Sequence, residues 1–230
     1  MGGYTTISTT GIEGFSGICL APDGSGFIAA SDRGGVYKVS FSGEATSLYV
    51  EKTGGSYDFG LDCEGVTLDP ATGDIYFVLE REKQEVRRVR APGYGESEVL
   101  ATINEGTFNS GLEAITWMGD GTLMVGNQAN PCLLLRLSAT DGSIISRREI
   151  TGGITDISDL CYDSVRNALW IADSETKTIN LCDLQGNVQK SYSVPFIDNG
   201  EGLCVDRERQ CIWVSDDTTA NIYKISFSNL

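Results

Sequence analysis

Three glutamates and two serines recur at nearly equal intervals along this chain. Glu64, Glu113 and Glu201 each precede a small residue and an apolar segment, and Ser16 and Ser158 occupy the same place in two related segments. Successive members are 48, 49, 45 and 43 residues apart. Carboxylate and hydroxyl oxygens, without nitrogen or sulfur, are ligands of hard cations, and calcium takes about six to eight oxygens. If the fold brings the five residues together, we expect them to bind one calcium ion. Magnesium fits a five-fold ring less well, because it requires a tighter octahedron.

Two other interpretations of the same residues need no metal. Carboxylates that meet in a narrow channel repel each other, and burial makes each one harder to ionise, so they could share protons instead. Each could also accept hydrogen bonds from backbone N–H groups at the contact between neighbouring structural units.

The elements that must position these residues form a repeat. Five hairpin-like segments can be aligned on the five positions, and each is followed by a further apolar strand. The first four repeats then add a fourth strand. Four short strands every 40 to 50 residues or so are typical of the blade of a β-propeller. The segments are FSGICLAPDGSGFIAASD (15–32), LDCEGVTLDPATGDIYFV (61–78), LEAITWMGDGTLMVGN (112–127), ISDLCYDSVRNALWIAD (157–173) and GEGLCVDRERQCIWVSD (200–216).

The sequence therefore predicts an all-β fold, a five-bladed propeller in one domain over residues 1–230. The fifth repeat ends in its third strand, and the strand-like segment Tyr4–Thr9 belongs to no repeat. We expect Tyr4–Thr9 to complete the last blade, which closes the ring and removes a free sheet edge. A β-sandwich or an open repeat array is the alternative. The expected blade cores are 15–51, 62–103, 111–150, 157–194, and 200–228 with 4–9.

Composition limits the possible binding partners and catalytic groups of the protein. The chain has 17 Lys and Arg against 32 Asp and Glu, a net charge of −15, which disfavours nucleic acid and membrane surfaces as partners. We expect a monomer. The absence of histidine excludes a Ser-His-Asp triad, a Cys-His dyad and any histidine-ligated metal. No apolar stretch approaches the length of a membrane span, so the chain is expected to be cytoplasmic, or periplasmic or extracellular if a leader has been removed.

The seven cysteines form no Cys-x-x-Cys pair, which disfavours a zinc or redox site. Cys19, Cys161 and Cys204 each lie three residues after a ring position, so we expect them to be small buried packing residues. A disulfide between Cys204 and Cys211, across one hairpin, is a minor alternative.

A second layer of polar residues is expected to surround the channel mouth above the ion. Each second strand ends on the same face where the first begins, and the loops that enter the first strands also reach this face. Aromatic side chains beside amides, acids and arginines would suit a polar small molecule. Turn chemistry is the simpler explanation for most of them. The candidate ligand-binding residues are Arg33, Tyr57, Phe59, Arg81, Asn127, Gln128, Asp156, Asp173 and Asp216.

Two resemblances to known families follow from these motifs. The segment CEGVTLDPATGDIYFVLERE, with Asp-x-Glu-Gly before a hairpin and Glu-Arg after it, resembles the bacterial SdiA-regulated family of propellers. The order Ser, Glu, Glu, Ser, Glu is similar to the central calcium site of soluble calcium-activated nucleotidases, another five-bladed family. That similarity implies that the five ring residues are calcium ligands. The nucleotidases carry much longer loops to hold their nucleotide. The resemblance therefore implies a calcium site more than it implies nucleotidase activity.

Two functional classes remain. The first is a binding protein whose calcium is mainly structural and whose channel mouth holds a small-molecule or protein ligand. The second is a calcium-dependent hydrolase of the phosphoesterase or nucleotidase kind, in which Glu80, Asp173 or Asp216 acts as base and Arg33 or Arg81 stabilises the developing anion. The lack of long loops, of histidine and of a basic phosphate cradle favours the first.

Overall fold

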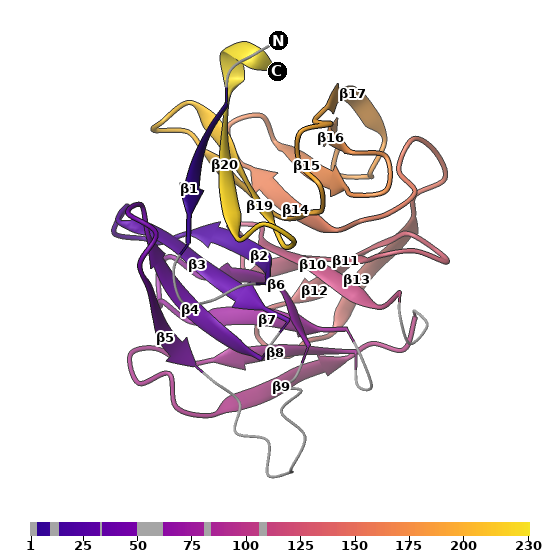
Figure 1. Ribbon diagram of the computed structural model, residues 1–230. Helices are drawn as coiled ribbons and strands as arrows, with labels where there is room; N and C mark the ends of the chain where they lie inside the picture. Colours follow the sequence, from indigo (N-terminus) through magenta and orange to yellow (C-terminus); the bar gives the residue numbers. More distant parts are fainter. Residues whose placement is uncertain (1–3, 10–13, 33, 50–61, 81–83, 106–109) are drawn as a thin grey trace.

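A computed structural model describes residues 4–9, 14–32, 34–49, 62–80, 84–105 and 110–230. In these residues, twenty strands form five antiparallel sheets of four strands each, arranged as a propeller (Figure 1). The prediction of an all-β, five-bladed propeller is confirmed. The described residues contain no helix with the length and apolarity that a membrane span requires.

The blades are numbered here in chain order. Blade 1 contains β2 (Phe15–Leu20), β3 (Gly26–Ser31), β4 (Gly35–Ser40) and β5 (Ala45–Tyr49). Blade 2 contains β6 (Cys63–Leu68), β7 (Ile75–Leu79), β8 (Glu85–Val89) and β9 (Ser97–Thr102). Blade 3 contains β10 (Leu112–Trp117), β11 (Thr122–Asn127), β12 (Leu133–Ser138) and β13 (Ile144–Glu149). Blade 4 contains β14 (Asp159–Asp163), β15 (Ala168–Asp173), β16 (Thr178–Cys182) and β17 (Val188–Ser193). Blade 5 contains β18 (Gly200–Asp206), β19 (Cys211–Asp216), β20 (Asn221–Ser226) and β1 (Tyr4–Ser8), and a short 3₁₀ turn, Phe227–Asn229, follows β20.

Burial follows the position of each strand in its blade. The second strands are buried on both faces because a neighbouring blade packs against each face, and every residue of β15 is buried. The fourth strands face solvent, and every residue of β13 is exposed. This gradient explains why the second strands read as continuous apolar runs rather than as an alternation.

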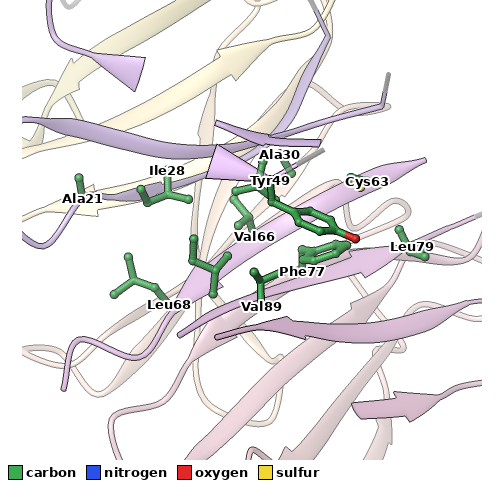
Figure 2. Close-up of a cluster of buried hydrophobic side chains, with 12 residues drawn as sticks. Ala21, Ile28, Ala30, Tyr49, Cys63, Val66, Leu68, Phe77, Leu79 and Val89 are labelled. Atoms are coloured by element: carbon green, nitrogen blue, oxygen red, sulfur yellow. The ribbon is translucent and has the colours of Figure 1, made fainter. Parts of the chain in front are cut away.

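The hydrophobic core is divided into five clusters, one at each contact between adjacent blades. Figure 2 shows the cluster between blades 1 and 2, where Ile28 and Tyr49 of blade 1 face Val66 and Phe77 of blade 2. Burial of apolar surface at these contacts is what holds the blades around a common axis.

The N-terminal strand closes the ring. β1 pairs with β20 in antiparallel register from Tyr4 opposite Ile225 to Ser8 opposite Asn221. The Tyr4 ring also stacks on Phe196, with 4.2 Å between centroids. The expected completion of the last blade by this strand is confirmed.

The described residues contain seven free cysteines. Cys204 lies opposite Trp213 in the β18–β19 register, whereas Cys211 lies opposite Asp206, so the two thiols are not cross-strand partners. The alternative of a Cys204–Cys211 disulfide is wrong for this reason.

Candidate functional site: an acidic cavity on the propeller axis

A cavity of about 270 Å³ opens at the face where the first strands of the blades begin. Seven of its ten lining residues are Asp or Glu, and among the residues that the structure describes no Lys or Arg lines it. We call it the acidic cavity. Its lining residues are Ser16, Asp32, Asp62, Glu64, Glu80, Glu113, Gln128, Asn199, Glu201 and Asp217.

Backbone irregularities bring the ring residues to this cavity. In blades 1, 2, 3 and 5 the pairing of the first and second strands shifts register at the ring position, at Ser16, Glu64, Glu113 and Glu201. A β-bulge of this kind re-aims one side chain relative to the regular alternation of the strand. The four residues at these bulges all line the acidic cavity.

Blade 4 differs. β14 pairs with β15 without a register shift, and Ser158 precedes the strand. The Ser158 hydroxyl donates to the Gly200 carbonyl at 2.9 Å, and Ser158 does not line the acidic cavity. The structure therefore brings together four of the five ring residues, and it directs the hydroxyl of the fifth to the neighbouring blade.

Glycine follows three of the ring residues because adjacent first strands approach closely there. A Cβ on Gly17 would lie 2.5 Å from the Glu64 carbonyl oxygen, and one on Gly65 would lie 2.6 Å from the Glu113 carbonyl oxygen. The first strands can therefore pack around a narrow axis only with glycine at these two positions.

The environment of the acidic cavity disfavours the ionised form of its glutamates. Burial, followed by the charges of Asp62 and Glu201, raises the pKa of Glu64 well above its usual range. Burial, followed by the charges of Glu64 and Glu80, also raises the pKa of Glu113 well above its usual range. Burial is also the main cause that raises the pKa of Glu201 to about 8. Without a cation, several of these groups must hold protons at neutral pH.

One part of the acidic cavity contains a group of carboxylates that could hold a metal ion. Asp62, Glu64 and Glu80 each offer a carboxylate oxygen, and these oxygens lie within 4.8 Å of one another. Oxygen-only donors of this kind fit a hard divalent cation such as calcium. Glu64 and Glu80 are almost completely buried, which makes a counter-charge more valuable to them.

The candidate ligand-binding residues fall into three groups: residues at or next to the acidic cavity, residues that stabilise loops, and residues outside the described part of the chain. Gln128 lines the acidic cavity, and its side chain hydrogen-bonds Asp156. Asp156 is 7% exposed, its Oδ1 has no partner among the described residues, and burial followed by Asp173 raises its pKa to about 6. Arg33, Tyr57, Phe59 and Arg81 lie outside the described residues.

The other three candidates stabilise loops rather than line the acidic cavity. Asn127 donates to the carbonyl oxygens of Ala129 and Pro131. The Asp173 carboxylate accepts hydrogen bonds from the backbone N–H groups of Thr155 and Thr176, and Asp216 accepts them from Asp198 and Thr218. These contacts correspond to the turn chemistry that was the simpler sequence interpretation.

Four lining residues were not among the candidate site residues: Asp32, Asp62, Asn199 and Asp217. Of these, Asp32, Asn199 and Asp217 lie at the strand ends and entering loops that were expected to surround the channel mouth. A signal for Asp62 was present, since it lies two residues before Glu64 in the Asp-x-Glu motif, and side chains two apart in a strand share a face. Asp32 and Asp217 follow directly after second strands, where turn chemistry conceals a role in a site.

Comparison with known families complements this geometry. Residues 10–132, more than half of the chain, match the family described as Phytase-like, "Esterase-like activity of phytase". The chain belongs to the phytase-like family. The resemblance to the SdiA-regulated family is not confirmed. A search of curated proteins gave no match. The matched part of this phytase-like chain includes Ser16, Glu64 and Glu113.

Solved structures share the propeller fold at low identity. Glutaminyl cyclase from Myxococcus xanthus is 11% identical, with a TM-score of 0.70, over 96% of this chain and 93% of that chain. XC5397 from Xanthomonas campestris, described as a gluconolactonase, is 15% identical, with a TM-score of 0.63, over 91% of this chain and 71% of that one. A chain of a nidogen/laminin complex is 14% identical, with a TM-score of 0.66, over 94% and 77% of the two chains. At these identities the comparisons show that the phytase-like chain shares the propeller fold with them.

Proposed function

We propose that this phytase-like propeller binds one calcium ion in the acidic cavity and holds a polar small molecule or protein ligand above it. The observation that carries the proposal is the gathering of seven carboxylates in a cavity whose described lining residues include no Lys or Arg. The protein acts as a monomer in this proposal, with neither nucleic acid nor membrane as a partner, in keeping with its net charge of −15.

The ion is assigned to Glu64, Glu113, Glu201 and Ser16, which line the acidic cavity. The hydroxyl of Ser158, the fifth ring position, is not part of this ligand set, because it donates to the Gly200 carbonyl. Asp62 and Glu80 lie close enough to Glu64 to share a cation with it. Three or more carboxylates would supply the charge that a tightly held calcium needs, and water or a ligand oxygen would complete its six to eight or so donors.

Calcium titration of metal-stripped protein tests the proposal. Isothermal titration calorimetry should give a stoichiometry of one, and calcium at about a hundredfold excess over Kd should stabilise the fold by about 2.7 kcal/mol. Glu113→Gln should weaken binding, because it removes one ligand charge and nearly preserves the shape of the side chain. The matched control is Glu208→Gln, the same change at a side chain that is 85% exposed, and it should bind calcium as the parent does. Absence of calcium binding by the parent would overturn the proposal.

A second candidate function is a calcium-dependent hydrolase acting on an ester or phosphoester. The family description, esterase-like activity of phytase, favours it, as does the position of Glu80 in the acidic cavity. A bound calcium would polarise the ester, and Glu80 would accept the proton of the attacking water. Arg33 and Arg81, adjacent in sequence to Asp32 and Glu80, would stabilise the anion that forms.

Hydrolysis assays separate the two functions. The protein would be assayed against p-nitrophenyl acetate, p-nitrophenyl phosphate and gluconolactone, with calcium and with chelator. Turnover that requires calcium and falls at least about a hundredfold in Glu80→Gln supports the hydrolase. Calcium binding without turnover of any of the three supports the binding protein.

A further inference from the structure

A second cavity lies at the end of the propeller opposite the acidic cavity. It has a volume of about 1060 Å³ and lies between the turns of blades 2, 3 and 4. β10 connects the two ends, since Glu113 lines the acidic cavity and Trp117 lines this one. Four residues of strand separate the two side chains by about 13 Å. We call the second cavity the aromatic cavity, and we infer that it binds a neutral oligosaccharide.

Trp117 is the central feature of the aromatic cavity. The chain has three tryptophans, and Trp170 and Trp213 donate their indole N–H groups to Asp163 and Asp206. Trp117 is partly exposed, and its indole N–H has no partner in the part of the chain that the structure describes. It is therefore the one indole free to donate to a bound molecule.

The Trp117 side chain is held in place by contacts with blade 2. It stacks on the buried Tyr76, with 5.9 Å between centroids and 23° between planes. Its backbone N–H donates to Thr67 Oγ1 at 3.0 Å. Tyr162, partly exposed, supplies a second aromatic ring at the wall of the aromatic cavity. A fixed aromatic surface loses little conformational entropy when a ligand binds to it.

The charged groups of the aromatic cavity have ion-pair or hydrogen-bond partners within the protein. Arg88 and Arg90 both pair with Glu98, at 2.5 and 2.9 Å. Asp69 accepts hydrogen bonds from Ala71 N and Thr72, and Asp74 accepts one from Ala91 N. A phosphate or a carboxylate would have to compete with Glu98 for the two arginines, and it would be repelled by Asp69 and Asp74, which also line the cavity. The aromatic cavity thus differs from the acidic cavity, whose described lining residues include no Lys or Arg.

These features indicate which class of ligand the aromatic cavity would bind. The hydroxyls of Thr140 and Ser164 line the aromatic cavity and have no side-chain hydrogen-bond partner among the described residues. A sugar ring has an apolar C–H face that can lie on an indole and hydroxyls around its edge that can bond these groups and the indole N–H. The volume, slightly above the about 300–1,000 Å³ of ordinary ligand pockets, gives room for several linked rings.

Binding of four hexasaccharides tests the inference: cellohexaose, maltohexaose, xylohexaose and mannohexaose. At least one at millimolar concentration should change the tryptophan fluorescence of the protein and give a calorimetric isotherm. Trp117→Ala should weaken that binding at least about tenfold, and Trp117→Phe, which keeps a ring stacked on Tyr76, should weaken it less. The far-end control Glu201→Gln and addition of chelator should leave it unchanged, which separates this site from the calcium proposal.

Three outcomes would overturn the inference. One is that none of the four hexasaccharides binds. Another is that Trp117→Phe and Trp117→Ala, or Trp117→Phe alone if the alanine variant does not fold, bind as the parent does. The third is that a proline-rich peptide, which also stacks on aromatic rings, binds at Trp117 while the sugars do not.

Discussion

Glu64, Glu113 and Glu201 favour the protonated state in the metal-free protein, because burial opposes ionisation and each has acidic neighbours. A cation reverses this preference, since it stabilises the ionised form of every carboxylate that it contacts. If the proposed calcium ion binds, protons and metal compete for the same carboxylates, and pH decides the outcome of that competition.

We expect the stability of the metal-free protein to fall between about pH 4.5 and pH 8. An acid whose pKa is higher in the folded state binds more protons when folded, so its contribution is complete below the unfolded pKa and is lost as pH rises through the folded pKa. For Glu201 this window runs from an ordinary 4.5 to about 8. Melting in EDTA should show a Tm several degrees lower at pH 8 than at pH 5. Glu201→Gln should flatten the dependence, and an unchanged Tm across this range in the parent would contradict the assignment.

The thiols near the axis are expected to be unreactive. Burial is the main cause that raises the pKa of Cys161 to about 12, and it also raises the pKa of Cys19 and Cys204. Since the thiolate is the reactive form, a disulfide-exchange reagent should label these three only after denaturant is added. Peptide mapping of native protein after brief labelling is the measurement, and rapid modification of all three would contradict it.

At the scale of the element, the repeat in the sequence was sufficient to predict the strands, their order and the ring positions. It could not predict which side chains reach the axis, because a bulge is a property of the pairing of two strands rather than of one segment. Blade 4 illustrates this. Where the other blades have Gly or Ala after the ring residue, blade 4 has Asp159, whose carboxylate accepts hydrogen bonds from Leu160 N and from Leu203 N of blade 5. That contact accompanies a regular pairing and leaves Ser158 directed away from the acidic cavity.

Gly65→Ala should destabilise the contact between blades 2 and 3. The added Cβ would lie 2.6 Å from the Glu113 carbonyl oxygen, and neighbouring backbone must shift to accept it, at about 1–3 kcal/mol. Gly152→Ala is the matched control, since its Cβ would have no atom within 4 Å. Chemical denaturation of both variants measures the difference, and equal midpoints would show that the first strands are not packed as described.

At the scale of the whole molecule, each blade buries its faces against two neighbours, and the ring is complete only because β1 joins blade 5 (Figure 1). The sequence predicted this closure from a missing strand and a surplus one. It could not predict the aromatic cavity, because Tyr76, Trp117 and Tyr162 come from three different blades and meet only when the ring forms.

Deletion of residues 1–9 should lower the Tm and promote association. β20 would lose its outer partner and expose a free edge, which pairs readily with other chains. Differential scanning fluorimetry and analytical ultracentrifugation would compare the truncated protein with Tyr4→Ala, which keeps the strand and removes the ring contacts with Phe196 and Tyr223. A truncated protein that is monomeric and melts like the parent would refute this role of β1.

The antiparallel pairing of β1 with β20 also determines how the molecule would respond to mechanical force. Tyr4 lies opposite Ile225, so the two ends of the chain leave the ladder at the same side (Figure 1). Tension between the ends would break the hydrogen bonds of this ladder one after another rather than all at once. A pull on the two ends would therefore open the ring at this seam, at low force, while the sheets of the other four blades carry no load.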